Sequence, residues 1–163
     1  MTKQLKPSSP PNPASVQKPQ AAPLPIPQPG DVLSYSYLWS HEAARGQEEG
    51  LKDRPVVVVV GLLTAAGRTQ LIVVPITHSA PDHAAGAIEL PQTIKRHLGL
   101  DQERSWIMIT EVNRFIWPGP DIRPIGDDGD PLFGALPDWF FLKLRDSFAR
   151  KLANKQLSDT RRT

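Results

Sequence analysis

An arginine stands at the start of the most apolar stretch of the chain, where its charge is held at the edge of a strand. Arg54 precedes Pro55 and the five valines of residues 56–60. β-Branched runs favour a strand that is buried on both faces, and proline, which has no N–H, belongs at the first position of such a strand. A guanidinium held at this edge is well suited to pair with a phosphate or a carboxylate. An ordinary ion pair at the rim of the fold is the alternative.

Histidines are the other side chains suited to proton transfer, because histidine titrates near neutral pH. His41 lies in a polar segment, and His78 follows Thr77 at the end of an apolar stretch. A surface position without chemistry is the alternative for both. The histidines at 41, 78, 83 and 97 lack the i, i+4 pairing of helical zinc sites, and no glycine-rich phosphate loop follows a strand. The chain has no cysteine, which excludes thiolate metal sites. We expect neither a metal nor a cofactor.

Two strands joined by a short turn must position these residues. The valine run continues to a turn at 65–68, and residues 70–75 form its partner in a β-hairpin. Thr77 lies just beyond the end of this second strand. A shorter strand over 32–37 precedes the hairpin, and the polar segment over 39–53 is expected to be a long loop.

Further strands and two helices follow the hairpin. Residues 87–90 and 105–112 are expected to be strands, and residues 91–98 a short helix that ends at a glycine. The last element is an amphipathic helix over 137–152, whose apolar side chains at helical spacing are Phe141, Leu144, Phe148 and Leu152. This order predicts a mainly β (α+β) fold, a small and strongly bent barrel with helices laid against it.

Proline content divides the chain into a tail and a folded part. Half of the 18 prolines precede Asp31, and residues 1–29 contain no acidic and no aromatic residue. Such a segment buries too little surface to offset its ordering entropy, so we expect a disordered tail, either a tether or a polyproline ligand. The folded domain is expected over 30–152, and a flexible basic tail over 153–163. Removing residues 1–28 should then change the unfolding midpoint by little.

The formal net charge of +2 is unevenly distributed. Residues 143–163 carry seven basic and two acidic side chains, and the tail has three lysines, which leaves residues 31–142 at −6. A nucleic-acid-binding domain usually carries its basic surface on the folded body, so the composition argues mildly against one. No apolar run is long enough to cross a bilayer and none has the form of a signal peptide, which predicts a soluble, cytoplasmic protein without a membrane partner.

The order of these motifs resembles the MazF/PemK toxins of type II toxin–antitoxin systems, which are RNA-cleaving proteins with an SH3-like barrel. The matching positions, in chain order, are Gly30-Asp31-Val32; Gly46, Glu48 and Gly50; Arg54-Pro55-Val56; Val74-Pro75-Ile76-Thr77; Ile107 to Glu111; and Pro137-Asp138. The chain departs from the family pattern in a longer first loop, a glutamate in place of the commoner aspartate at 111, an acidic body and an additional proline-rich tail.

The resemblance implies a metal-independent endoribonuclease that cuts single-stranded RNA by attack of a 2′-hydroxyl on the adjacent phosphate. It assigns Arg54 and Thr77 to the phosphate, where preorganised charge is often the largest catalytic contribution. It assigns proton transfer to Glu111, with His78 and His41 as further candidates for acid or base. A barrel that has lost catalysis and binds a protein or RNA partner is the alternative.

The resemblance also implies contacts and partners. The expected RNA-binding residues are Gln47, Glu48, Lys52, Asn113 and Arg114. A cognate antitoxin and a second copy of the chain, in a homodimer, are the expected protein partners.

Glu111 and His78 compete for the role of proton carrier. His78 follows Thr77 directly, so on an extended chain it points to the opposite side from Thr77. A turn over 79–81 could swing the imidazole back toward the phosphate. We therefore expect Glu111→Gln to cost more activity than His78→Ala.

Overall fold

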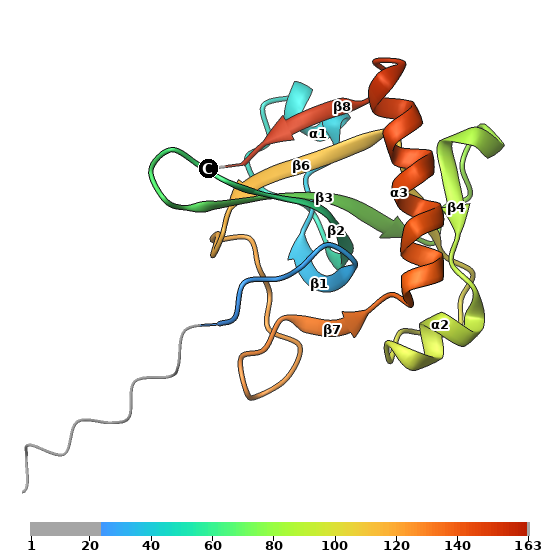
Figure 1. Ribbon diagram of the computed structural model, residues 1–163, viewed down its shortest axis with the longest axis horizontal. Helices are drawn as coiled ribbons and strands as arrows, with labels where there is room; N and C mark the ends of the chain where they lie inside the picture. Colours follow the sequence, from blue (N-terminus) through green and yellow to red (C-terminus); the bar gives the residue numbers. More distant parts are fainter. Residues whose placement is uncertain (1–23, 163) are drawn as a thin grey trace, which may run out of the picture.

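Eight strands and three helices make up residues 24–162, the part of the chain that this computed structural model describes (Figure 1). The strands are β1 (Asp31–Ser36), β2 (Asp53–Leu63), β3 (Thr69–Thr77), β4 (Ala87–Glu89), β5 (Trp106–Met108), β6 (Glu111–Ile116), β7 (Leu132–Ala135) and β8 (Ser158–Arg161). The helices are α1 (Ser40–Ala44), α2 (Gln92–His97) and α3 (Asp138–Ala153). The predicted α+β class is confirmed. The strand order β4-β5-β3-β2-β1-β7 is an open path, so these pairings show no closed barrel among the described residues.

The predicted hairpin is confirmed as β2–β3, and it lies at the centre of the sheet. The two strands pair antiparallel, and a turn at 64–68 joins them, where Gly67 takes a φ of 77° that favours glycine. Val56 and Val58 belong to one hydrophobic core, whereas Val57 and Val59 belong to the other. The valine run is therefore buried on both faces, because successive side chains of a strand point to opposite sides.

Helix α3 covers one face of the sheet (Figure 1). Its buried side chains are Phe140, Leu144 and Phe148, one turn apart on the helix. The predicted apolar stripe is wrong at both ends, because Phe141 is only partly buried and Leu152 is 59% exposed. The helix therefore faces the sheet along a line slightly rotated from the one that its sequence suggests.

The predicted strand over 105–112 is two strands. β5 pairs with the end of β3 at Ile76 and Thr77, whereas β6 pairs with the first half of β3, over 70–73. The interruption falls opposite Pro75, which has no N–H for a ladder. Instead, the Ile109 N–H donates to the Gly86 carbonyl at 3.0 Å. This break places Glu111 at the start of β6.

The segment beyond α3 is ordered, so the prediction of a flexible tail over 153–163 is wrong for the residues of β8 and for Arg162. β8 pairs in parallel with β6, and Figure 1 shows it running beside β6 and close to α1. Arg162 follows β8 and is 7% exposed. Two of the chain's basic residues that sequence reasoning assigned to a frayed end therefore belong to the fold.

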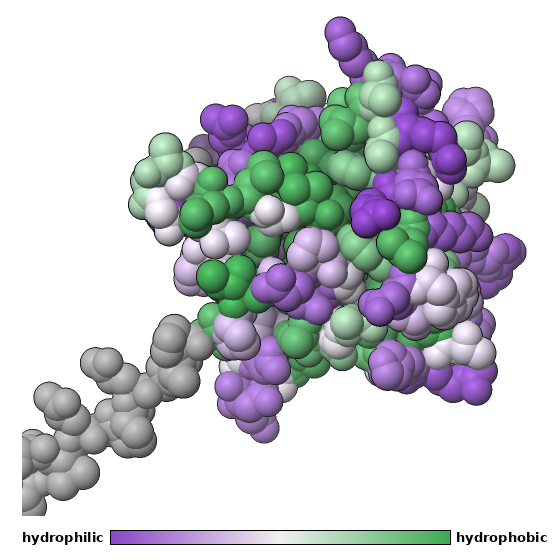
Figure 2. Space-filling model, in the orientation of Figure 1, coloured by the Kyte–Doolittle hydropathy of each residue, from purple (hydrophilic) through white to green (hydrophobic). Residues whose placement is uncertain are grey.

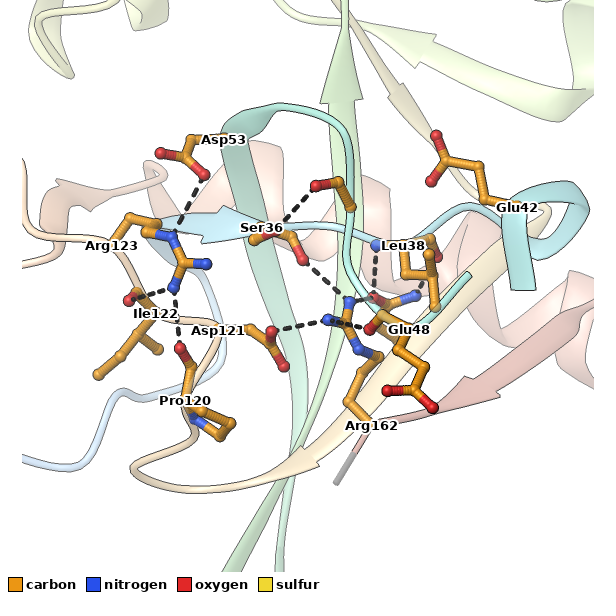
Figure 3. Close-up of polar contacts among 12 residues, drawn as sticks. Ser36, Leu38, Glu42, Glu48, Asp53, Pro120, Asp121, Ile122, Arg123 and Arg162 are labelled. Atoms are coloured by element: carbon orange, nitrogen blue, oxygen red, sulfur yellow. Dashed lines mark hydrogen bonds and ion pairs between the residues drawn. The ribbon is translucent and has the colours of Figure 1, made fainter. Parts of the chain in front are cut away.

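Arg162 connects four separate segments (Figure 3). Its Nη1 donates to the Ser36 carbonyl at 2.9 Å and to Asn113 Oδ1 at 3.4 Å. Its Nη2 donates to the Glu48 carbonyl at 3.1 Å and to Asp121 Oδ1 at 2.7 Å. This guanidinium thus holds the end of β1, the loop before β2, strand β6 and the segment after it at fixed positions.

The predicted disordered tail lies partly outside the described residues, over 1–23. Residues 24–29 are described and reach the sheet: Pro27 is buried, and the Gln28 N–H donates to Asp31 Oδ2 at 2.7 Å. The tip of the β2–β3 hairpin projects from the sheet, and Figure 2 shows apolar surface there. Leu62 and Leu63 are 46% and 79% exposed.

Candidate functional site

Two neighbouring hollows meet at the strand ends that carry Arg54 and Thr77. We call the larger, of about 520 Å³, the Trp39 hollow, and the smaller, of about 410 Å³, the Lys95 hollow. The residues that line both are Lys52, Arg54, Thr77 and Ser79. These four residues therefore form the wall between the hollows, with two cations and two hydroxyls in it.

Arg54 is placed by β2 at the edge of the core that surrounds Tyr35. It pairs with Tyr35 across the β1–β2 ladder, and its guanidinium carbon lies 4.9 Å from the centre of the Trp39 ring. The alternative of a rim ion pair is not seen, since no ion pair among residues 24–162 includes Arg54. Its Nε is buried without a hydrogen-bond partner among the described residues. The guanidinium is thus held by stacking, and its two terminal nitrogens, rather than the buried Nε, are the donors that a ligand can reach.

Burial lowers the pKa of Arg54, and three nearby groups oppose the shift: Glu42, then Tyr37 and Glu111. Arginine still remains charged at neutral pH, because its ordinary pKa is above about 12. Arg54 is therefore a fixed positive charge in a partly desolvated wall.

Thr77 is the last residue of β3 and is 9% exposed. Its Oγ1 accepts a hydrogen bond from the Ser79 N–H at 3.2 Å. The hydroxyl proton is consequently left to donate toward the hollow. Arg54 and Thr77, which lie 23 positions apart in the sequence, come together because β2 and β3 are hairpin partners.

Trp39, His41 and Glu42 line the Trp39 hollow from α1 and the residue before it. This short helix interrupts the predicted loop over 39–53. The Trp39 and His41 rings lie 6.4 Å apart and nearly parallel, at 22°. Glu42 is 5% exposed, and its Oε2 accepts a hydrogen bond from the backbone N–H of Trp39 at 3.1 Å. Aromatic planes and a held carboxylate thus face the same space as Arg54.

His78 lies at the opposite side of the shared wall, in the Lys95 hollow. Its Nε2 lies 2.8 Å from Asp101 Oδ2 and its Nδ1 lies 3.2 Å from Glu103 Oε2. His78 is exposed while Thr77 is buried, as alternation predicts, but both line this hollow. The alternation therefore agrees with the expectation for an extended chain, yet His78 still borders the same hollow as Thr77.

Lys95 holds the loop that carries Asp101 and Glu103, the two carboxylates in contact with His78. The Lys95 side chain is fully buried, and its Nζ donates to Asp101 Oδ1 and Ser105 Oγ, each at 2.7 Å, and to the Glu103 carbonyl. The hydrogen bond from Lys95 lowers the pKa of Asp101. Since all three ammonium protons are used, Lys95 orders the Lys95 hollow rather than offering a free charge to it.

Glu111 lines neither hollow, although the family resemblance assigns it to proton transfer, and it lies within electrostatic range of Arg54 and His41. Its Oε1 accepts the Tyr37 hydroxyl at 3.2 Å and the Ser40 N–H at 3.0 Å, and its Oε2 accepts the Ser40 hydroxyl at 3.3 Å. Burial raises the pKa of Glu111, and these hydrogen bonds oppose the shift. In this position the carboxylate fastens α1 to the start of β6.

Among the expected RNA-binding residues, Lys52 is the one that lines the hollows. Asn113 is fully buried, and its side-chain amide exchanges hydrogen bonds with the backbone of Leu38, at 3.0 and 2.7 Å. Arg114 pairs with Asp159 of β8. Asn113 and Arg114 thus connect β6 to Leu38 and to β8.

Gln47 and Glu48 lie in the loop before β2, and hydrogen bonds to other segments hold this loop in place. The Gln47 N–H donates to the Glu42 carbonyl at 3.1 Å, and the Glu48 carbonyl accepts from Arg162 (Figure 3). Neither residue lines a hollow. Gly50 lies against the Tyr37 carbonyl so closely that a Cβ would collide with it, so the loop can follow this path only with glycine.

The residues that sequence reasoning missed are Trp39, Glu42 and Lys95. The alternation of Tyr35, Tyr37 and Trp39 was a usable signal, because residues two apart on an extended chain share a face. Glu42 and Lys95 had no comparable signal, since each takes its place through contacts with segments distant in the sequence.

The arrangement suits binding of an anion with an attached flat group. The shared wall supplies a fixed guanidinium and a hydroxyl donor, and each hollow adds a histidine. Residues 24–162 contain no group of three side chains that could hold a metal ion, and none of their helices has the length and apolarity to cross a membrane. No protein-family model and no curated protein matches this chain.

Proposed function

We propose that this protein is a MazF/PemK-like toxin, a metal-independent endoribonuclease that cuts single-stranded RNA. The observation that carries the proposal is the shared wall, where Arg54 and Thr77 lie between two hollows. A phosphate bound there leaves space on each side for the nucleotide that it joins. The order of the motifs in the sequence, from Gly30 to the C-terminal helix, supports the same function and an SH3-like arrangement of the sheet.

The reaction needs a charge on the phosphate and a proton carrier on each side of it. The 2′-oxygen attacks phosphorus and loses its proton to a base, while the bond to the 5′-oxygen breaks and that oxygen gains a proton from an acid. Arg54 stabilises the charge that develops on the non-bridging oxygens, and the Thr77 hydroxyl donates to the same group.

We assign the two proton transfers to His41 and His78. His41 lines one hollow and His78 the other, so a phosphate on the shared wall has a histidine on either side, as an in-line displacement requires. Asp101 is held by Lys95 and anchors His78 through Nε2. Glu103 is 72% exposed, so its side chain can move and release the Nδ1 of His78.

A catalytically inactive barrel that binds RNA or a protein is the second candidate, and the position of Glu111 favours it. The acidic residue that the family resemblance assigns to catalysis is engaged by Tyr37 and Ser40 and lines neither hollow. Under this alternative, Arg54 and Trp39 would still bind a ligand without cleaving it.

The proposal includes cytoplasmic RNA as substrate, a cognate antitoxin and a homodimer. The exposed apolar residues Leu62 and Leu63 at the tip of the central hairpin offer surface for one of these protein contacts (Figure 2). Size-exclusion chromatography with light scattering measures the oligomeric state directly.

The decisive experiment is incubation of the pure protein with a long unstructured RNA in excess chelator. We expect cleavage that leaves a 2′,3′-cyclic phosphate and a free 5′-hydroxyl. Arg54→Ala should lower the cleavage rate by about 100-fold or more and abolish growth inhibition, because a preorganised donor to the transition state is lost. Its unfolding midpoint should stay close to that of the wild type.

Arg104→Ala is the matched control. Arg104 also lies over a tryptophan, at 5.0 Å from the Trp106 ring centre, and pairs with Glu89, but it lines neither hollow. We expect it to cut RNA at the wild-type rate. Full activity of Arg54→Ala, or a requirement for magnesium, would refute the mechanism.

A further inference from the structure

The Trp39 hollow has the composition of a site for a flat, polar ring. Trp39 is half-buried, with the Arg54 guanidinium 4.9 Å from its ring centre and His41 nearly parallel to it. Met108 and the 74% exposed Leu51 add apolar contact to the lining. A nucleobase stacks well on aromatic rings and on guanidinium planes, and such stacking works for single-stranded RNA, whose bases are unpaired.

The Trp39 hollow lies beside the residues proposed to bind the phosphate, and this determines which base of an RNA chain can enter it. Arg54 and Thr77 line it and form the wall toward the Lys95 hollow as well. A phosphate bound to this wall brings a directly attached nucleotide to the mouth of the Trp39 hollow. At about 520 Å³, the hollow has room for one base and its sugar.

Glu42 adds chemical selectivity to this stacking surface. It is 5% exposed and lines the hollow, and its carboxylate is oriented because Oε2 accepts a hydrogen bond from the backbone N–H of Trp39. A carboxylate accepts hydrogen bonds and cannot donate them. The amino groups of cytosine, adenine and guanine are donors that fit it. Uracil has no exocyclic amino group: its 4-position carries a carbonyl oxygen, which the carboxylate repels, and its single imide N–H lies between two such oxygens.

We propose that the Trp39 hollow binds the base next to the phosphate held by Arg54, and that Glu42 selects a base with an exocyclic amino group over uracil. The inference rests on the proposed function for its RNA substrate, but it concerns binding and not cleavage. It makes Trp39 the stacking residue and Glu42 the residue that determines specificity at this position.

The test measures binding of uncleavable 2′-O-methyl pentanucleotides in which each position in turn carries cytosine, adenine, guanine or uracil. The wild type should disfavour uracil by about tenfold at one position. Glu42→Gln should remove this preference and improve uracil, because the amide adds an N–H donor while its oxygen still accepts the Trp39 N–H. Trp39→Ala should weaken all four bases by about tenfold, and Trp39→Phe should recover most of the affinity.

Trp139→Ala is the matched control, because Trp139 is a 63% exposed tryptophan of α3 that does not line the hollow. It should bind like the wild type, and the unfolding midpoint of every variant confirms that it is folded. The inference is overturned if Trp39→Phe and Trp39→Ala bind like Trp139→Ala, if Glu42→Gln keeps the wild-type base order, or if no pentanucleotide binds.

The same measurements separate this inference from the proposed function. If the oligonucleotides bind with the expected base order but long RNA stays uncut, the base site stands and the catalytic proposal fails. If long RNA is cut while the four bases bind alike, the catalytic proposal stands and the base site fails.

Discussion

Glu111 is a carboxylate that the fold partly removes from water. It is half-buried, and desolvation raises the pKa of its carboxyl above the ordinary value of 4.5. The folded protein therefore binds more protons than the unfolded chain between pH 4.5 and the raised pKa. Because of this linkage, the free energy of unfolding falls as the pH rises through that window.

Glu111→Gln should remove this loss of stability. The amide can accept from Ser40 and donate to an oxygen, so it keeps the attachment of α1 without the charge. We expect the free energy of unfolding of the variant, relative to the wild type, to rise as the pH increases from 4.5 and then to level off. Urea unfolding at a series of pH values measures it, and Asp121, whose pKa is also raised by burial, contributes equally to both proteins.

Glu89→Gln is the control with the opposite sign. The hydrogen bond from Arg104 lowers the pKa of Glu89, so its contribution to stability is present above the ordinary pKa and is lost as the pH falls. If the free energy of unfolding depends on pH in the same way for the wild type and for Glu111→Gln, then burial does not raise the pKa of Glu111.

At the scale of the elements, β8 and the following Arg162 hold in place the segments that carry the site. The guanidinium bonds to Ser36 and Glu48, which belong to the segments on either side of α1, and to Asp121 (Figure 3). Trp39 directly precedes α1, and the loop after α1 leads to Arg54 in β2. Contacts that the far end of the chain makes therefore fix the lining of the Trp39 hollow.

Arg162→Ala should destabilise the protein by about 3 kcal/mol, because it leaves the Asp121 carboxylate buried and two carbonyls without their donor. Urea unfolding measures the change. Arg161→Ala, at the neighbouring last position of β8, is the control, since Arg161 is exposed, and it should stay within about 0.5 kcal/mol of the wild type. Adding Asp121→Asn to Arg162→Ala should recover part of the loss. Equal stability of the two arginine variants would mean that β8 is not docked in solution.

At the scale of the whole molecule, the short segment before β1 belongs to the folded body. Residues 24–27 line an apolar hollow that also contains Trp117 and Leu132, and Pro27 is buried. The Asp31 N–H donates to the Gln28 carbonyl at 3.0 Å. Composition alone predicts that removal of residues 1–28 changes the unfolding midpoint by little. Because residues 24–28 pack against the folded body, we now expect their removal to lower stability.

Two truncated chains test the point. A chain that begins at residue 24 keeps these contacts, whereas a chain that begins at residue 29 loses them. We expect the second to be less stable than the first by about 1 to 2 kcal/mol, from the apolar surface that Pro27 and its neighbours cover. Thermal or urea unfolding of both chains decides it, and coincident curves would show that the segment contributes nothing.

The sequence by itself determined the α+β class, the central hairpin, the short helix before Gly99 and the position of Arg54 and Thr77 at adjacent strand ends. These features depend on local rules: a β-branched run makes a strand, a turn of small residues pairs it with the next strand, and the pairing then brings the two strand ends together.

Only the tertiary structure decided which polar residues face the hollows and which hold the fold. Arg162 is buried because it meets Ser36, 126 positions away, and Glu111 is withdrawn because it meets Tyr37, 74 positions away. β8 has no apolar alternation and becomes a strand through its pairing with β6. Such contacts leave no periodic signal in their own segments, since burial of a polar side chain depends on partners that the rest of the fold supplies.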